Sequence, residues 1–161
     1  MRLASNAFNN LDPIPKQYSE LGGNLSPPFS WTDVPAGTQE LALIGDDPDA
    51  PTAEPWVHWV IYGLSPDLTG LPEGIAREKV ITVPIRALQG RNSLPANNIG
   101  YEGPNPPQGH GVHRYYFTLY ALDTGLKIPP GATKKDLLEA MQGHVLVKTE
   151  LIGTYERFLN R

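Results

Sequence analysis

Apolar residues in this chain gather in short runs whose length and composition are typical of β-strands. Glu40–Gly45 and His58–Leu64 are rich in Leu, Val, Ile and aromatic residues, which favour strands. Tyr115–Asp123 contains neither Pro nor Gly and has apolar residues on both faces, as expected for the central strand of a sandwich. The pattern therefore predicts at least three buried strands.

One α-helix and a further strand are predicted near the C-terminal end. Thr133 is a suitable N-cap with Asp136 three residues later, and Gly143 stands where a helix of this kind ends. The apolar residues between them fall on one helical face. Val145–Tyr155 alternates between apolar and polar residues, which predicts a strand with Val147 among its inward-facing residues.

The remaining segments are dense in turn-forming residues. The chain has 17 Pro and 16 Gly among 161 residues, which is unfavourable for a helical protein. Pro and Gly recur throughout Ser65–Gly111, for which we predict a long excursion with one short strand at Val80–Pro84. Length and composition together predict a single, loop-rich β domain spanning residues 1–161.

Charge and composition exclude several classes of function. The formal net charge of −4 argues against a nucleic-acid partner or an anionic membrane surface. The absence of Cys excludes disulfides, thiolate zinc sites and cysteine nucleophiles. Apolar runs are too short for stable membrane insertion, and the first residues show no signal-peptide core, so we expect a cytoplasmic protein.

Common catalytic signatures are also missing. The chain has no phosphate-binding G-x-x-x-x-G-K-[ST] loop, no G-x-S-x-G elbow and no H-E-x-x-H zinc motif. A nucleotide-binding enzyme or a standard serine hydrolase is therefore not expected, and neither is a bound cofactor.

Two patches combine titratable residues with Pro-rich loops. The first is D-D-P-D-A-P at residues 46–51, followed by W-V-H-W at residues 56–59. The second runs from Tyr101 to Tyr115 and contains G-H-G-V-H-R-Y. Proline limits the conformational freedom of such loops, so they can hold side chains in place. Because both patches adjoin predicted strand ends, we expect them to meet at one end of the sandwich.

Each patch also has an ordinary structural interpretation. An Asp in an Asp-Pro turn usually caps its own backbone, and a single His at a strand end is more often structural than functional. His110 lies between two glycines and is predicted to be an exposed loop residue. Three of the four histidines fall beside the two patches, which weakens the structural interpretation.

Together the patches resemble the phosphatidylethanolamine-binding protein family, also called the Raf kinase inhibitor protein family. D-P-D-A-P at 47–51, W-x-H at 56–58 and the G-x-x-P-P…G-x-H-R-Y run at 103–115 match its signatures in order. The short segment after Tyr155 resembles the bacterial and archaeal branch. The resemblance implies a mainly β fold, an antiparallel Greek-key β-sandwich with one or two peripheral helices and a small anion-binding pocket.

The resemblance also implies the residues of that pocket. They are three titratable residues and a set of wall residues: Asp47, His58 and His113, with Ala50, Pro51, Trp56, Pro107 and Tyr115.

Elementary chemistry suggests how such a pocket works. Two imidazoles can each donate an N–H to a phosphate or carboxylate oxygen, and Asp47 can accept from a ring nitrogen and so orient one of them. Arg114 alternates away from His113, so we expect it to pair with Asp47 or Asp49. A tight turn here also suggests a cis bond at Asp47–Pro48 or Ala50–Pro51.

These observations favour a non-catalytic binding protein for phosphate monoesters or phospholipid head groups such as phosphoethanolamine. The alternative is a regulator that inhibits a protein kinase or protease through surface loops, with a target that the sequence does not identify. A hydrolase using Asp47, His58 and His113 and a zinc site built from the same residues are further alternatives. A homodimer is compatible with the resemblance.

Overall fold

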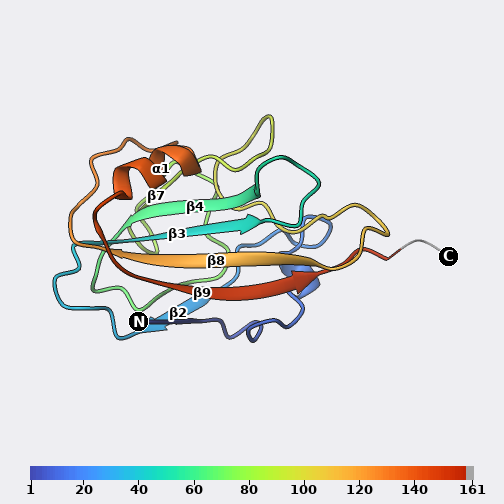
Figure 1. Ribbon diagram of the computed structural model, residues 1–161, viewed down its shortest axis with the longest axis horizontal. Helices are drawn as coiled ribbons and strands as arrows, with labels where there is room; N and C mark the ends of the chain where they lie inside the picture. Colours follow the sequence, from blue (N-terminus) through green and yellow to red (C-terminus); the bar gives the residue numbers. More distant parts are fainter. Residues whose placement is uncertain (159–161) are drawn as a thin grey trace.

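Six strands form the larger of two antiparallel sheets in the computed structural model, which describes residues 1–158 (Figure 1). Their order across the sheet is β6 (Val80–Ile81), β7 (Ala87–Gln89), β4 (Trp56–Leu64), β3 (Glu40–Asp47), β8 (His113–Leu122) and β9 (Val145–Tyr155). The smaller sheet contains β1 (Arg2–Ala4), β2 (Phe29–Thr32) and β5 (Gly70–Leu71). The predicted antiparallel sandwich fold is confirmed.

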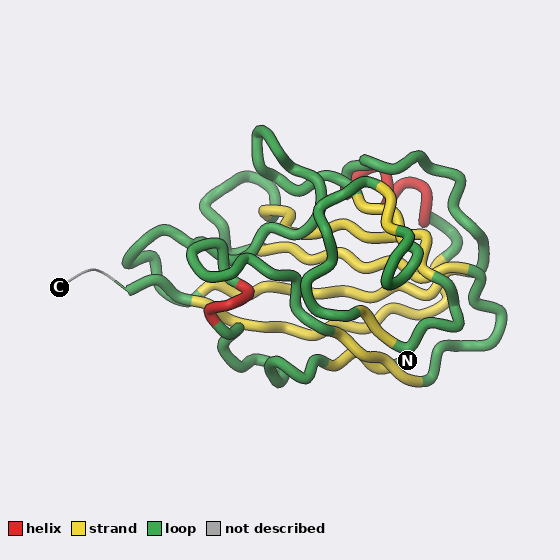
Figure 2. Tube along the Cα trace, turned by 180° about the vertical axis from the view of Figure 1, so that it is seen from behind, coloured by secondary structure: helices red, strands yellow, loops and turns green. Residues whose placement is uncertain are grey.

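Apolar side chains fill the space between the sheets. Leu43 on β3, Trp59 on β4 and Phe117 on β8 belong to one buried cluster with Phe29 and Trp31 of the smaller sheet. Figure 2 shows the smaller sheet and long loops covering this face of the larger sheet. The burial of these large apolar surfaces is the main stabilising contribution to the sandwich.

α1 (Lys134–Met141) packs on part of the other face of the larger sheet, near β3 and β4 (Figure 1). Leu137 and Met141 of this helix pack in a second buried cluster that includes Ile44 and Tyr62 of the sheet. β3 and β4 are therefore buried on both faces, which explains their nearly continuous apolar sequence.

Local signals at the helix end agree with the sequence. The Thr133 side chain accepts a hydrogen bond from the Asp136 backbone N–H, and the Asp136 carboxylate accepts one from the Thr133 N–H. This capping box satisfies two of the helix's otherwise unpaired donors. A short 3₁₀-helix, η1 (Lys16–Tyr18), precedes β2.

Several short strands differ from the prediction. Residues 65–111 contain three short strands rather than one, and β1 and β2 lie within the turn-rich N-terminal segment. These strands are two to four residues long, and pairing with neighbouring strands of the sheets rather than their own sequence pattern stabilises them. Val147 is 36% exposed rather than turned into the core, although Leu151 on the same face is buried.

The suggested cis bond at Asp47–Pro48 or Ala50–Pro51 is wrong. The one cis peptide bond in residues 1–158 is Val83–Pro84. The turn after β3 is instead held by the Asp47 side chain, whose Oδ1 accepts the Asp49 N–H at 2.8 Å. Such a capped turn reverses the chain with trans bonds throughout.

Within the described residues, no helix has both the length and the apolar character needed to cross a membrane.

Candidate functional site

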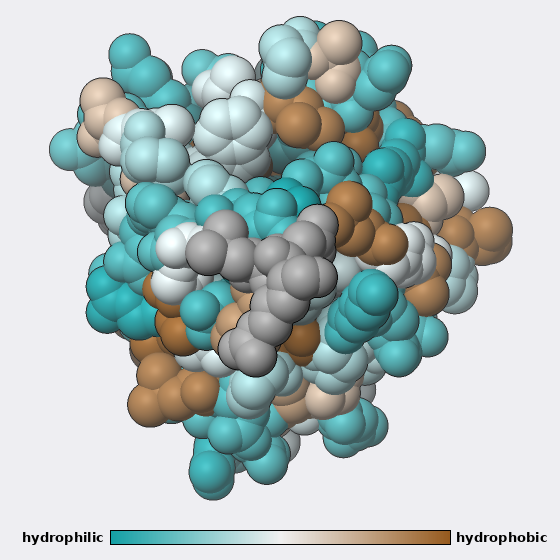
Figure 3. Space-filling view, turned by 90° about the vertical axis from the view of Figure 1, so that its right-hand side faces the viewer, coloured by the Kyte–Doolittle hydropathy of each residue, from teal (hydrophilic) through white to brown (hydrophobic). Residues whose placement is uncertain are grey.

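A cavity of about 400 Å³ lies at the end of the larger sheet where β3 ends and β4 and β8 begin. Figure 3 looks onto this end of the molecule, where apolar residues form separate groups among polar ones. All of the predicted site residues line the cavity: Asp47, Ala50, Pro51, Trp56, His58, Pro107, His113 and Tyr115.

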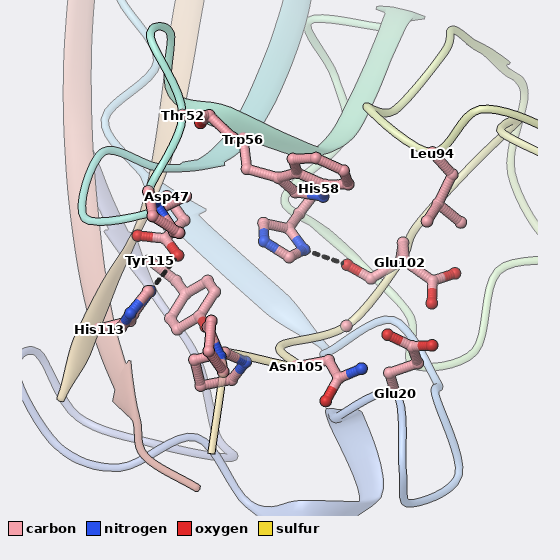
Figure 4. A pocket seen from close by; sticks show the side chains of 15 residues that line it. Glu20, Asp47, Thr52, Trp56, His58, Leu94, Glu102, Asn105, His113 and Tyr115 are labelled. Carbon is pink, nitrogen blue, oxygen red and sulfur yellow. Dashed lines mark hydrogen bonds and ion pairs between the residues drawn. The ribbon is translucent and has the colours of Figure 1, made fainter. Parts of the chain in front are cut away.

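Strand register explains why the two sequence patches meet. Asp47 pairs with Trp56 across β3 and β4, and Asp46 faces Tyr116 across β3 and β8. Side chains two residues apart on a strand share a face, so Trp56 and His58 point the same way, as do His113 and Tyr115. Figure 4 shows these side chains converging on the cavity from the three strands.

Asp47 and His113 form a buried pair. Nδ1 of His113 lies 2.6 Å from Oδ2 of Asp47, and the two residues are 1% and 3% exposed respectively. Nδ1 therefore donates to the carboxylate, which orients the ring as the sequence suggested.

The second nitrogen of His113 also has a partner. Its Nε2 lies 2.6 Å from Nδ1 of His110. His110 is exposed, as predicted, but it reaches back to the buried ring. The His113 nitrogen that we expected to donate to a ligand is therefore bonded to His110 in the free protein.

His58 is held differently. Its Nδ1 lies 2.5 Å from the carbonyl oxygen of Glu102, which only accepts, so Nδ1 carries the proton. Burial lowers the pKa of His58 below its usual value, although the Glu102 carbonyl and Asp47 act in the opposite direction. The neutral ring then has its lone pair on Nε2, so His58 in this state is an acceptor rather than the predicted donor.

Tyr115 completes the polar part of the cavity. Burial raises the pKa of its hydroxyl, with a smaller contribution from the charge of Asp47. The hydroxyl therefore stays protonated and is available as a hydrogen-bond donor. Its ring packs edge-on against His58, with ring centroids 5.1 Å apart.

Two acidic residues of the cavity were not recognised in the sequence. Glu20 follows η1, and Glu102 lies within the second patch; Figure 4 shows both across the cavity from Asp47 and His113. The Glu102 side chain is 7% exposed, and the Arg77 guanidinium lies 3.6 Å away. Burial raises the pKa of Glu102. No local motif marks Glu20, because only the folded chain brings it to the site.

The remaining lining residues lie in loops: Thr52, Leu94, Gly103, Asn105 and Pro106.

Arg114 anchors the turn below the cavity. Its Nε and Nη2 donate to the two Asp49 carboxylate oxygens, each at 2.9 Å, and its backbone N–H also donates to Asp49. The predicted pairing is confirmed for Asp49, whereas Asp47 binds His113 instead. The Arg114 interactions lower the pKa of Asp49.

The donor set does not resemble a metal centre. Within residues 1–158, no group of three or more His, Asp or Glu side chains is arranged to hold a metal ion.

Comparisons with known proteins agree with this architecture. The family model described as phosphatidylethanolamine-binding protein matches residues 4–156. A UPF0098 protein of Methanothermobacter thermautotrophicus is 50% identical over 157 residues, covering 98% of this chain and 99% of the relative.

Two crystal structures extend the similarity to the fold. A phosphatidylethanolamine-binding protein homologue from Chlamydia trachomatis has a TM-score of 0.85 and 46% identity, with 97% of each chain covered. YbcL of E. coli, described as a member of the mammalian family, has a TM-score of 0.87 and 28% identity, covering 96% of this chain and 97% of its own. The chain therefore belongs to the phosphatidylethanolamine-binding protein family.

Proposed function

We propose that this protein is a non-catalytic binding protein whose cavity takes a small phosphate-bearing head group, with phosphoethanolamine preferred over inorganic phosphate. The observation that carries the proposal is the division of the cavity into a His/Tyr side and an acidic side. The first suits a phosphate group, and the second suits an ammonium group.

The His/Tyr side offers both donors and acceptors. The Tyr115 hydroxyl donates, while Nε2 of His58 accepts in the neutral ring. A phosphate monoester has a second pKa of about 6 and so shares a proton readily with an imidazole near neutral pH. One proton held between Nε2 of His58 and a phosphate oxygen makes a charge-assisted hydrogen bond. We expect binding to raise the apparent pKa of His58.

The acidic side makes a plain anion a poor ligand. Glu20 and Glu102 form this side of the cavity, Asp47 lies across it in its pair with His113, and the lining includes no Lys or Arg. Arg77 offsets part of the Glu102 charge from outside the lining, but a dianion such as inorganic phosphate still meets Glu20 and Glu102 with no cationic group of its own. An amino group beside the phosphate pairs with them instead, and the Trp56 ring adds an aromatic surface that favours cations.

Affinity measurements by NMR of the backbone amides test the proposal. Phosphoethanolamine, inorganic phosphate and ethanolamine are titrated separately at pH 7.5 into the parent protein. We expect phosphoethanolamine to bind more tightly than either fragment, with the largest shifts around Asp47, His58 and Tyr115.

The Glu102→Gln variant separates the ammonium contact from the rest of the site. It removes one charge while keeping the shape of the side chain, and should weaken phosphoethanolamine binding about tenfold, the effect of one charge-assisted hydrogen bond. Inorganic phosphate should bind the variant at least as well as the parent. Glu54→Gln is the control, because Glu54 is exposed and does not line this cavity. Equal affinity of the parent for phosphate and phosphoethanolamine contradicts the proposed preference.

The absence of catalysis is part of the proposal and needs its own check. Among the lining residues, the hydroxyls are those of Thr52 and Tyr115, and neither has a His or carboxylate partner that would activate it as a nucleophile. Phosphorus NMR of the protein with phosphoethanolamine should show no release of inorganic phosphate over many hours. Steady release would instead favour the hydrolase alternative.

Other expectations from the sequence stay predictions. They are a cytoplasmic location, a homodimer, and action on a protein kinase or protease through surface loops.

A further inference from the structure

The loop before β8 brings an exposed histidine back onto the buried site. His110 lies between Gly109 and Gly111, whose φ angles are +75° and +92°. A side chain added at Gly111 would meet nothing within 4 Å, so this glycine serves the backbone conformation rather than packing. The resulting turn carries the His110 ring to His113, with ring centroids 4.8 Å apart.

The contact extends a continuous chain of hydrogen bonds from the cavity to solvent. Asp47 accepts from Nδ1 of His113, and Nε2 of His113 faces Nδ1 of His110, with 2.6 Å at each step. His113 is 1% exposed, whereas His110 is exposed. His110 does not line the cavity itself. His110 therefore covers Nε2 of His113 from the loop that precedes β8.

The hydrogen bond between His110 and His113 persists in all but one of their protonation states. With His113 bonded to Asp47 through Nδ1–H, its Nε2 accepts from the Nδ1–H of a neutral His110. One additional proton on either ring leaves a single hydrogen between the two facing nitrogens, so the bond is kept. Only protonation of both rings places two N–H groups face to face and breaks it.

The surrounding charges come from three elements and one loop. Asp47 ends β3, Asp49 lies in the loop after it, and Arg114 follows His113 on β8. The Arg114 guanidinium is paired with the Asp49 carboxylate. Tyr155 on β9 pairs with His113 in register. The direct ionic partner of the histidine pair is thus the Asp47 carboxylate.

We propose that His110 is a latch on the binding site. This inference rests on the proposed function. The His110 ring occupies Nε2 of His113 in the free protein and must move away before a phosphate oxygen of the ligand, carrying the proton that the neutral ring lacks there, can share that proton with Nε2. His110 therefore lowers the affinity for a phosphate-bearing ligand, and the loop at residues 107–112 acts as the moving part.

The loop is suited to this movement. Residues 107–110 and Val112 are exposed, and the loop is tied down by few backbone hydrogen bonds. The Gly109 N–H donates to the Arg157 carbonyl at 2.8 Å, and the His110 N–H donates to the Pro107 carbonyl at 3.1 Å. A small backbone rotation at Gly109 and Gly111 moves the His110 side chain away from His113 without disturbing β8.

The His110→Ala variant tests the latch. His144→Ala is the matched control, because His144 is also an exposed histidine with an acidic partner, Asp123, at 2.8 Å. Phosphoethanolamine affinity is measured at pH 7.5 for the parent and both variants. We expect His110→Ala to bind about twofold to tenfold more tightly, the range that the net strength of one hydrogen bond gives. His144→Ala should match the parent.

Ring nitrogen NMR of the ligand-free proteins gives a second readout. In the parent, Nε2 of His113 should show a hydrogen-bonded signal that changes in His110→Ala and stays unchanged in His144→Ala. An unchanged His113 signal, or an affinity in His110→Ala equal to or weaker than that of the parent, overturns the latch while the proposed function stands. If neither parent nor variant binds phosphoethanolamine, both the proposed function and the latch are wrong.

Discussion

At the scale of single residues, His58 shows how the fold sets the state of a titratable group. The ring is buried, which favours the neutral form and lowers its pKa below the usual value, although the bond from its Nδ1–H to the Glu102 carbonyl acts in the opposite direction. Protonation near neutral pH then requires a compensating anion. A ligand phosphate would supply one, which links the protonation of this residue to binding.

This state has a consequence for the pH dependence of stability. Below about pH 6.5 the unfolded chain protonates His58 more readily than the folded protein does, so stability falls as pH falls from that value towards the lowered pKa. His58→Asn retains a donor for the Glu102 carbonyl but does not titrate. We expect the free energy of unfolding to fall less in this variant than in the parent between pH 7.5 and pH 5.5.

Urea unfolding at several pH values provides the comparison. Other titrating groups are common to both proteins and cancel in the difference. The same loss of stability in both proteins would show that His58 is not held in the neutral form.

Arg114 illustrates a residue beside the site that has a structural role. Its guanidinium donates hydrogen bonds to both Asp49 carboxylate oxygens and does not line the cavity. We expect Arg114→Ala to lower the Tm, because the turn after β3 loses its anchor, while phosphoethanolamine affinity stays within about twofold, well under the tenfold of a lost charge-assisted bond. Calorimetric melting and the same NMR titration measure the two effects. A large loss of affinity with an unchanged Tm would make Arg114 a ligand-binding residue instead.

The sequence predicted the individual pocket residues better than their hydrogen bonds. Asp47, His58 and His113 stand at strand ends next to stiff loops, so local pattern and the family resemblance sufficed to find them. The His110 contact depends on the loop conformation set by two glycines, and Glu20 comes from a distant turn-rich segment. Neither has a signature in the adjacent sequence.

At the scale of secondary-structure elements, β9 depends on a close approach to the N-terminal segment. A side chain at Gly153 would lie 2.4 Å from Ile14 Cγ1 and 2.9 Å from Phe8, both in the buried core. Backbone hydrogen bonds also join this part of β9 to residues 11–14. Gly153 pairs with Tyr115 in register, so the approach also supports the strand that carries the site.

We therefore expect Gly153→Ala to destabilise the protein by about 2 kcal/mol, the usual cost of overpacking a core. Gly125→Ala is the control, because a side chain there meets nothing within 4 Å. Urea unfolding measures both variants. A cost below about 0.5 kcal/mol, as for an ordinary surface substitution, would show that the N-terminal segment shifts freely and does not brace β9.

The long elements could be predicted from sequence, whereas the short strands could not. β3, β4, β8 and β9 carry continuous or alternating apolar patterns, and α1 carries a capping box. β5 and β6 are two residues long, too short for any periodicity, and exist because β2 and β7 respectively supply their hydrogen bonds.

At the scale of the whole molecule, the sandwich holds the strands of the larger sheet in place around the cavity at one end of that sheet. The smaller sheet covers one face and α1 packs on part of the other, so β3 and β4 are held on both sides. The cavity gathers residues from Glu20 to Tyr115, which come together only in the complete fold. Ligand binding should therefore stabilise the whole domain rather than one loop.

The most direct test of this account follows the histidine ring protons by NMR while phosphoethanolamine is added over a range of pH. His58→Ala and His113→Ala assign the two rings. We predict that the ligand shifts both ring signals and raises the apparent pKa of His58. If neither ring responds to millimolar phosphoethanolamine, the cavity is not a phosphate-binding site and the account is contradicted.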